Sequence, residues 1–131
     1  MFSYILQPRS GLPTYLQLVH QVKEALRVRR LKPGDQLPTV RQVGEELGIS
    51  ANTVLKAYRE LEREGLVKSK PAVGTFVERT LGAESRLNDA VLQRSLQRWM
   101  REAERAGLDE ESVAALFAVT LRDRRRRGAA S

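Results

Sequence analysis

Four polar side chains recur at helical spacing in the segment 51–63, and they are the residues best placed to bind another molecule. At about 100° per residue, Asn52, Lys56, Arg59 and Arg63 fall on one helix face that holds no acidic residue. An amide and three cations can bind an anionic polymer through hydrogen bonds and charge. A solvated face is the usual role of such a run in an isolated helix, so the neighbouring elements decide between the two interpretations.

Residues for other kinds of chemistry are scarce. The sequence has no cysteine and one histidine, His20, which has no partnered acid or nucleophile nearby in the sequence and is interpreted as structural or exposed. The acidic residues are scattered along helices, and no Gly-rich phosphate loop occurs. We therefore expect no enzyme, no metal site and no cofactor.

The stretch before the polar face predicts a short helix and a tight turn. Thr39 and Gln42 have the spacing of a capping box, in which each side chain bonds the backbone of the other. Gly48 suits a left-handed helix end, and Ser50 suits the cap of a following helix. The turn is therefore predicted at 48–50. The core face of this first helix consists of Val40, Val43 and Leu47.

The second helix carries its apolar residues opposite the polar face. These residues are Val54, Ala57, Tyr58 and Leu61. Two helices joined by a tight turn form a helix-turn-helix, whose second helix enters the major groove of DNA. This arrangement favours nucleic-acid binding over simple solvation.

A small β-hairpin is predicted after Gly65. Alternating residues form two short runs, 66–69 and 75–78, joined by a turn that contains Pro71 and Gly74. Lys68, Lys70 and Thr75 are suited to phosphate contacts, which position a protein without reading sequence.

Residues 13–78 resemble the winged-helix domain of the GntR family of bacterial transcription regulators. The sequence of residues 51–65 is similar to that of the YtrA-like branch, whose members have a short C-terminal region. The resemblance rests on an ordered pattern: Leu31, Lys32, Pro33, Gly34, Asp35, Leu37, Pro38, Thr39, Arg41, Val43, Leu47, Gly48, Ile49, Ser50, Thr53, Val54, Ala57, Tyr58, Leu61, Glu64, Gly65, Leu66, Gly74, Thr75, Phe76 and Val77.

The resemblance implies double-stranded DNA as the partner. Base edges would be approached by Asn52, Lys56 and Arg59, since Asn pairs with adenine and Lys or Arg with guanine. The DNA backbone would be anchored by Arg41, Ser50, Thr53, Lys68, Lys70, Gly74 and Thr75.

The sequence departs from the family pattern in two places. Ala51 and Leu55 stand where many members carry base-reading arginines, so those arginines cannot be transferred to this sequence. Arg29 and Arg30 stand where a glycine usually ends the first helix. Glycine tolerates that conformation best, so we expect a frayed or altered helix end there.

Composition agrees with an anionic partner. The chain has 131 residues, a formal net charge of +7 and a pI near 10.4. Residues 1–79 hold 13 Lys or Arg against 8 Asp or Glu, and residues 80–131 hold 10 against 8. No apolar run approaches the ~20 residues that span a bilayer, and no signal peptide begins the sequence. A cytoplasmic protein without a membrane partner is expected.

The N-terminal residues predict an arm followed by a helix. Apolar residues in the arm, 1–12, suggest that it docks on the first helix or on another subunit. Pro13 can begin that helix, which runs to about Val28. Its apolar face consists of Tyr15, Leu18, Val19, Val22 and Leu26.

Residues 80–131 predict two amphipathic helices and a basic tail. Gly107 would end the first helix and Asp109 would cap the second. Two such helices bury little alone, so a homodimer seam is favoured over packing on the same chain. The seam residues are Leu87, Val91, Leu92, Leu96, Trp99, Met100, Val113, Leu116, Phe117 and Leu121. Arg122 to Arg127 are interpreted as a solvated tail after the helix, with a DNA contact as the alternative.

The predicted fold class is mainly α with a small β-wing: a winged helix-turn-helix at 1–79, followed by a two-helix dimerisation region at 80–131. The predicted function is a sequence-specific transcription regulator, in the first place a repressor, that binds an inverted-repeat operator as a homodimer. A small-molecule effector stays unknown. The alternative is a winged-helix protein-interaction module without sequence-specific DNA binding.

Overall fold

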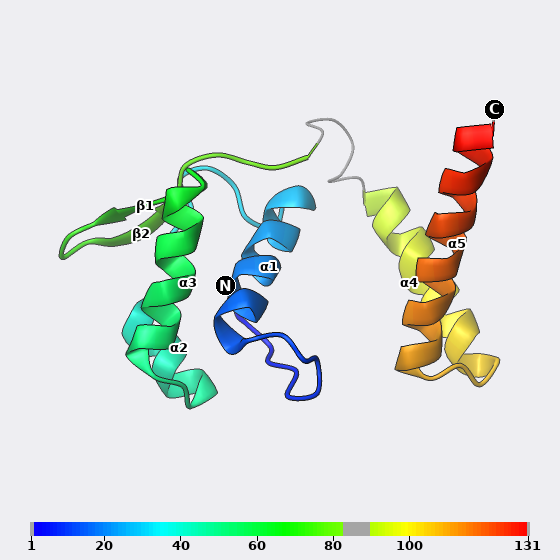
Figure 1. Cartoon of the computed structure of the whole chain (residues 1–131), viewed down its shortest axis with the longest axis horizontal. Helices are drawn as coiled ribbons and strands as arrows, with labels where there is room; N and C mark the ends of the chain where they lie inside the picture. The colour runs from blue at the N-terminus through cyan, green and yellow to red at the C-terminus, as the bar shows by residue number, and fades with distance from the viewer. Residues whose placement is uncertain (1, 83–89, 131) are drawn as a thin grey trace. The chain divides into compact units, whose positions relative to one another are not determined.

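The computed structural model describes residues 2–82 and 90–130, with side chains up to residue 128. These residues form two compact units, and the winged unit comes first in the chain (Figure 1). The described elements, in chain order, are α1 (Thr14–Arg27), α2 (Val40–Leu47), α3 (Ala51–Arg63), β1 (Val67–Lys70), β2 (Gly74–Val77), α4 (Ala90–Arg105) and α5 (Glu110–Ala130).

Helix α1 ends in a well-formed turn rather than a frayed one. Arg29 adopts a left-handed conformation with φ of 62°. The Arg30 amide donates to the Ala25 carbonyl at 2.8 Å, and the Arg29 amide donates to Leu26 at 3.4 Å. This is a Schellman motif, in which glycine is the usual left-handed residue. The expected altered end is therefore present, with an arginine in the glycine position.

The helix-turn-helix has the caps predicted from the sequence. The Gln42 amide donates to Thr39 Oγ1 and the Thr39 amide donates to Gln42 Oε1, which completes the capping box. Gly48 is left-handed with φ of 66°, and Ser50 Oγ accepts from the Thr53 amide at 3.2 Å. The turn at 48–50 and both helix starts are confirmed.

The wing contains a pairing that was not predicted from the sequence. Strands β1 and β2 pair antiparallel, with Val67 opposite Val77. Residues 34–37 pair with the edge of β2 that faces away from β1. The Leu37 amide donates to the Thr75 carbonyl at 2.9 Å, and the Val77 amide donates to the Asp35 carbonyl at 2.8 Å. The predicted hairpin is correct, but both strands were misplaced by one residue. Gly74 begins β2 instead of belonging to the turn.

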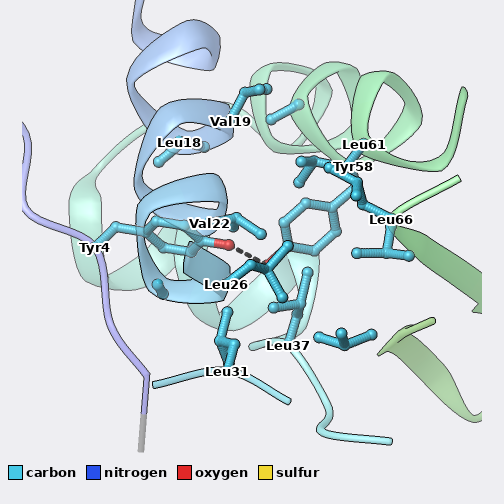
Figure 2. Close-up of a cluster of buried hydrophobic side chains, with 14 of the residues drawn as sticks. Tyr4, Leu18, Val19, Val22, Leu26, Leu31, Leu37, Tyr58, Leu61 and Leu66 are labelled. Atoms are coloured by element: carbon cyan, nitrogen blue, oxygen red, sulfur yellow. Dashed lines mark hydrogen bonds between the residues drawn. The ribbon is translucent and has the colours of Figure 1, made fainter. Parts of the chain in front are cut away.

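The core of the winged unit joins its three helices to the wing (Figure 2). It contains the apolar faces predicted for α1 and α3, together with Val43 of α2. The N-terminal arm packs on α1: Gln21 exchanges hydrogen bonds with the Ile5 backbone, and Gln17 bonds Gln7, Ser10 and Leu12. The expectation that the arm docks on the first helix is confirmed.

The C-terminal unit is a helical hairpin of α4 and α5. Gly107 is left-handed in the turn, and Asp109 caps α5 by accepting from the Ser112 amide at 2.8 Å. The tail interpretation was wrong, because α5 stays helical through Arg122 to Arg127. Arginine has a high helix propensity, and a run of charge alone does not end a helix. No helix among the residues described is long and apolar enough to cross a membrane.

Candidate nucleic-acid interface

Helix α3 presents its polar face away from the core. Val54, Ala57, Tyr58 and Leu61 are buried, whereas Asn52, Lys56 and Arg59 are exposed. Asn52 and Arg59 form no side-chain hydrogen bond or ion pair with the described residues, so their polar groups are available to a ligand. Arg63 differs, since its Nε donates to Glu60 at 3.0 Å and this hydrogen bond lowers the pKa of the Glu60 carboxyl.

Lys56 has a fixed neighbour on α1. Its Nζ lies 4.1 Å from the centre of the Tyr15 ring, within the range of a cation–π interaction. Tyr15 is the second residue of α1 and is half-buried. The ammonium group therefore lies at the side of α3 nearest to α1, while Asn52 and Arg59 are the unpaired members of the face.

The predicted backbone contacts at the turn are partly engaged in capping. Ser50 Oγ and Thr53 Oγ1 lie 2.9 Å apart and bond each other. Arg41 on α2 is exposed, with a surface ion pair to Glu45 at 3.1 Å. Such pairs are weak in water, so Arg41 can exchange Glu45 for a phosphate at small cost.

The wing carries the remaining predicted residues on its two strands, β1 and β2. Lys68 and Lys70 are exposed on β1, and Lys70 Nζ lies 5.0 Å from the centre of the Phe76 ring. Thr75 is half-buried opposite Ser69. A Cβ at Gly74 would lie 2.4 Å from Nε2 of Gln36, so that flexible side chain would have to move, and the φ of 144° is one that residues with a Cβ rarely adopt.

Hydrogen bonds from several elements hold α3 in place. Tyr58 Oη donates to the Pro38 carbonyl at 2.6 Å, next to the cap of α2. Glu62 Oε2 accepts from the Ser69 amide at 2.8 Å in β1, and Lys23 Nζ of α1 pairs with Glu64 at 2.8 Å. The polar face of α3 is thus fixed relative to α1, α2 and the wing.

Burial perturbs the two tyrosines in this framework. Burial raises the pKa of Tyr58 to about 12, although the hydrogen bond from Tyr4 lowers it in part. Burial, with the nearby Tyr58, raises the pKa of Tyr4 well above its ordinary value. Both hydroxyls therefore stay neutral at physiological pH and act as hydrogen-bonding groups.

Sequence reasoning missed Tyr4, Tyr15 and Gln36 as parts of this framework. Tyr15 was assigned to an apolar face and Tyr4 only to an arm of apolar content. The signal for Tyr58 was stronger, because a hydroxyl on a buried helix face needs a partner.

The predicted dimerisation residues lie mostly exposed on α4 and α5. Trp99 and Phe117 contact each other with ring centres 5.1 Å apart, and Val113 is buried. Leu87 lies outside the described residues. The other predicted seam residues are exposed at 41–62%: Val91, Leu92, Leu96, Met100, Leu116 and Leu121. Among the residues described, no group of three or more His, Cys, Asp or Glu is arranged to hold a metal ion.

A capped helix pair, a hairpin wing and an exposed amide and cations on the second helix define a winged-helix DNA-binding protein. Residues 14–77 match the family model of bacterial regulatory proteins, gntR family. The chain is 34% identical over 111 residues to the HTH-type transcriptional repressor YtrA of Bacillus subtilis (strain 168), with 82% of this chain and 84% of that protein covered. The chain therefore belongs to the GntR family of transcription regulators, in its YtrA-like branch.

Solved structures agree over different parts of the chain. A transcriptional antiterminator from Listeria monocytogenes EGD-e is 26% identical with a TM-score of 0.58, covering 93% of this chain and 92% of that one. The DNA-binding domain of AraR in complex with operator ORX1 is 27% identical with a TM-score of 0.51, covering 57% of this chain and 94% of that one. The relatives are regulators of transcription and not enzymes, which is consistent with the expectation of no enzyme.

Proposed function

We propose that this protein is a sequence-specific transcriptional repressor that binds an inverted-repeat operator as a homodimer. The observation that carries the proposal is the exposed face of α3. Asn52 and Arg59 project from this face, and the opposite face of the helix is buried in the core. A rigid helix with unpaired donors is what base recognition in a major groove requires.

Base and backbone contacts are assigned by position. Asn52, Lys56 and Arg59 read base edges, because they lie on the exposed side of α3. Arg41, Ser50 and Thr53 contact phosphates beside the turn, and the wing contributes Lys68, Lys70, Gly74 and Thr75. The side-chain positions support this assignment, and the operator-bound AraR domain supports duplex DNA as the partner.

Repression is supported by the relative YtrA, which is named a repressor. A repressor needs only to occupy its operator.

Dimerisation is supported by the apolar faces of α4 and α5. Their side chains line a groove of about 460 Å³ formed by Leu92, Ser95, Leu96, Trp99, Leu116, Phe117 and Thr120. Exposed apolar side chains gathered along one groove favour an interaction site. A second copy supplies an identical apolar surface, as a two-fold interface requires.

The function is tested by selecting operator sequences with the purified full-length protein and measuring affinities for operator and random DNA. Asn52→Ala and Lys56→Ala should each weaken operator binding by roughly 1 to 3 kcal/mol and should weaken binding to random DNA by less. Lys70→Ala is the control and should weaken both DNAs alike. Wild-type operator binding by both α3 variants would sink the assignment.

The interaction-module alternative is tested with a salt series on random DNA. Affinity set by phosphate contacts falls steeply as the salt concentration rises. A wild-type protein that binds no DNA at low salt would favour the alternative.

A further inference from the structure

The last turns of α5 carry an unusual concentration of positive charge. The arginine run, residues 122–127, holds five arginines in six positions, with Asp123 between them. All six residues are exposed and helical. Every arginine of the run has another arginine three or four residues away, a spacing at which like charges destabilise a helix. The ion pairs found among the described residues include none from the run.

The helical hairpin places this run at the end where the chain enters α4. Trp99 and Phe117 are in contact, which sets the antiparallel register of α4 against α5. Nine positions separate Ala90 from Trp99, and nine separate Phe117 from Arg126. At an equal rise per residue, the run therefore lies level with the first turns of α4.

We propose that the arginine run binds the phosphate backbone of DNA that flanks the operator half-site. Arginine forms paired hydrogen bonds with phosphate and keeps its charge at any physiological pH. The inference rests on the proposed function, because the winged unit must hold the duplex. Once it does so, the run on the same chain meets neighbouring phosphates at high effective concentration.

Helix stabilisation and membrane binding explain the arginine run less well than DNA binding does. Cations in the last turn favour a helix dipole, but that effect acts within one turn and does not require five arginines. An anionic membrane would attract the charge, but residues 122–127 contain no apolar side chain to insert below the headgroups. Phosphates of DNA need only charge and hydrogen-bond donors.

The experiment compares two full-length variants with equal loss of charge. The first replaces Arg125, Arg126 and Arg127 with glutamine. The matched control replaces Arg98, Arg101 and Arg105 of α4, which lie farther along the hairpin, with glutamine as well. Each lowers the formal net charge from +7 to +4. Circular dichroism and light scattering verify that helix content and oligomeric state match the wild type.

Binding is measured on random DNA and on operator DNA with and without about 10 flanking base pairs on each side, over a salt series. Loss of up to three phosphate contacts makes the slope of log K against log salt shallower by about 2 to 3. At 0.1 M salt the affinity for flanked DNA should fall between about 10-fold and about 500-fold. The control should retain wild-type slope and affinity, and the run variant should gain less than the wild type from added flanks.

Three outcomes would overturn the proposal. In the first, the run variant binds flanked DNA with the wild-type salt slope. In the second, the control loses as much affinity for flanked DNA as the run variant does. In the third, the run supports binding to phosphatidylglycerol vesicles while DNA binding is unchanged, which identifies lipid as the partner. Failure of the proposed function appears separately, as equal wild-type affinity for operator and random DNA, because phosphate contacts do not alter that ratio.

Discussion

Tyr4 and Tyr58 join their hydroxyl groups across 54 residues of sequence. Tyr4 Oη donates to Tyr58 Oη at 3.0 Å (Figure 2). Tyr58 Oη in turn donates to the Pro38 carbonyl at 2.6 Å. Both side chains are buried, so each hydroxyl depends on a protein partner. This chain of bonds connects the N-terminal arm to α3 and to the residue before the cap of α2. It therefore fixes the geometry of the helix-turn-helix.

Removing the central hydroxyl should cost more than removing the outer one. Tyr58→Phe leaves both the Tyr4 hydroxyl and the Pro38 carbonyl without this partner and should lower the free energy of unfolding by about 1 to 3 kcal/mol. Tyr4→Phe leaves the bond to Pro38 in place and should cost about 0.5 to 1.5 kcal/mol. Urea unfolding measures both. The double variant should cost less than the sum, and strict additivity would show that the hydroxyls are not coupled.

Stability should fall at alkaline pH because of the same tyrosines. The pKa of Tyr58 is raised to about 12 and that of Tyr4 is raised too, against about 10 in an unfolded chain. The folded state therefore holds these protons more tightly. Their contribution is fully present below pH 10 and is lost as pH rises through the window from 10 to 12, at up to about 1.4 kcal/mol per pH unit for each tyrosine.

Thermal unfolding between pH 9 and pH 12 tests this expectation. Lysines also titrate in this range, so the double variant Tyr4→Phe/Tyr58→Phe is the control. Its melting temperature should decline less steeply than that of the wild type. Parallel decline in the two proteins would contradict the argument.

The helix boundaries were predictable because their signals are local. Thr39, Gly48 and Ser50 act on backbone groups within a few residues, and the apolar faces of α1 and α3 follow from helical spacing alone. The pairing of residues 34–37 with β2 was not predictable, since that strand lies far along the chain. The same holds for Tyr4 with Tyr58 and for Tyr15 with Lys56, which depend on the packing of three helices. The helix at 122–127 was not predicted, because the run of charged residues was interpreted as a tail that follows the end of the helix.

Arg29 offers a test of backbone strain. Its φ of 62° lies in the left-handed region, which costs a residue with a Cβ roughly 1 kcal/mol more than glycine. Arg29→Gly should therefore raise the free energy of unfolding by about 0.5 to 1 kcal/mol. Arg30→Gly is the matched control, because it removes the same charge at a neighbouring residue whose φ is not positive. Equal effects of the two changes would show that conformation is not the cause.

Tyr15 should influence DNA binding through Lys56. Removing the ring in Tyr15→Leu releases the ammonium group and should weaken operator binding by about 0.5 to 1 kcal/mol, the strength of an exposed cation–π contact. Tyr15→Phe keeps the ring and should bind as the wild type does. In a Lys56→Ala background, Tyr15→Leu should have no further effect on affinity. A loss that persists in that background would mean that Tyr15 acts independently of Lys56.

Assembly depends on the apolar faces of α4 and α5. If these faces form a two-fold interface, Leu96→Asp places a charge where the partner subunit must pack, and burying an unpaired charge is costly. Leu96 is 46% exposed in the single chain, so the monomer tolerates the change. Light scattering should show a dimeric wild type and a monomeric Leu96→Asp. A chain ending at Arg79 should also be monomeric, since it lacks both helices.

Operator binding should weaken in these monomers without any change in the contacts to one half-site. A dimer engages its second half-site at high effective concentration, which a monomer forfeits. Wild type and Leu96→Asp should therefore have similar affinities for a single half-site, while only the wild type gains from an inverted repeat with centres one or two helical turns apart. Arg98→Asp, on the same helix, tests whether any new carboxylate is disruptive. A Leu96→Asp protein that stays dimeric and binds the full operator unchanged would show that α4 and α5 serve another purpose.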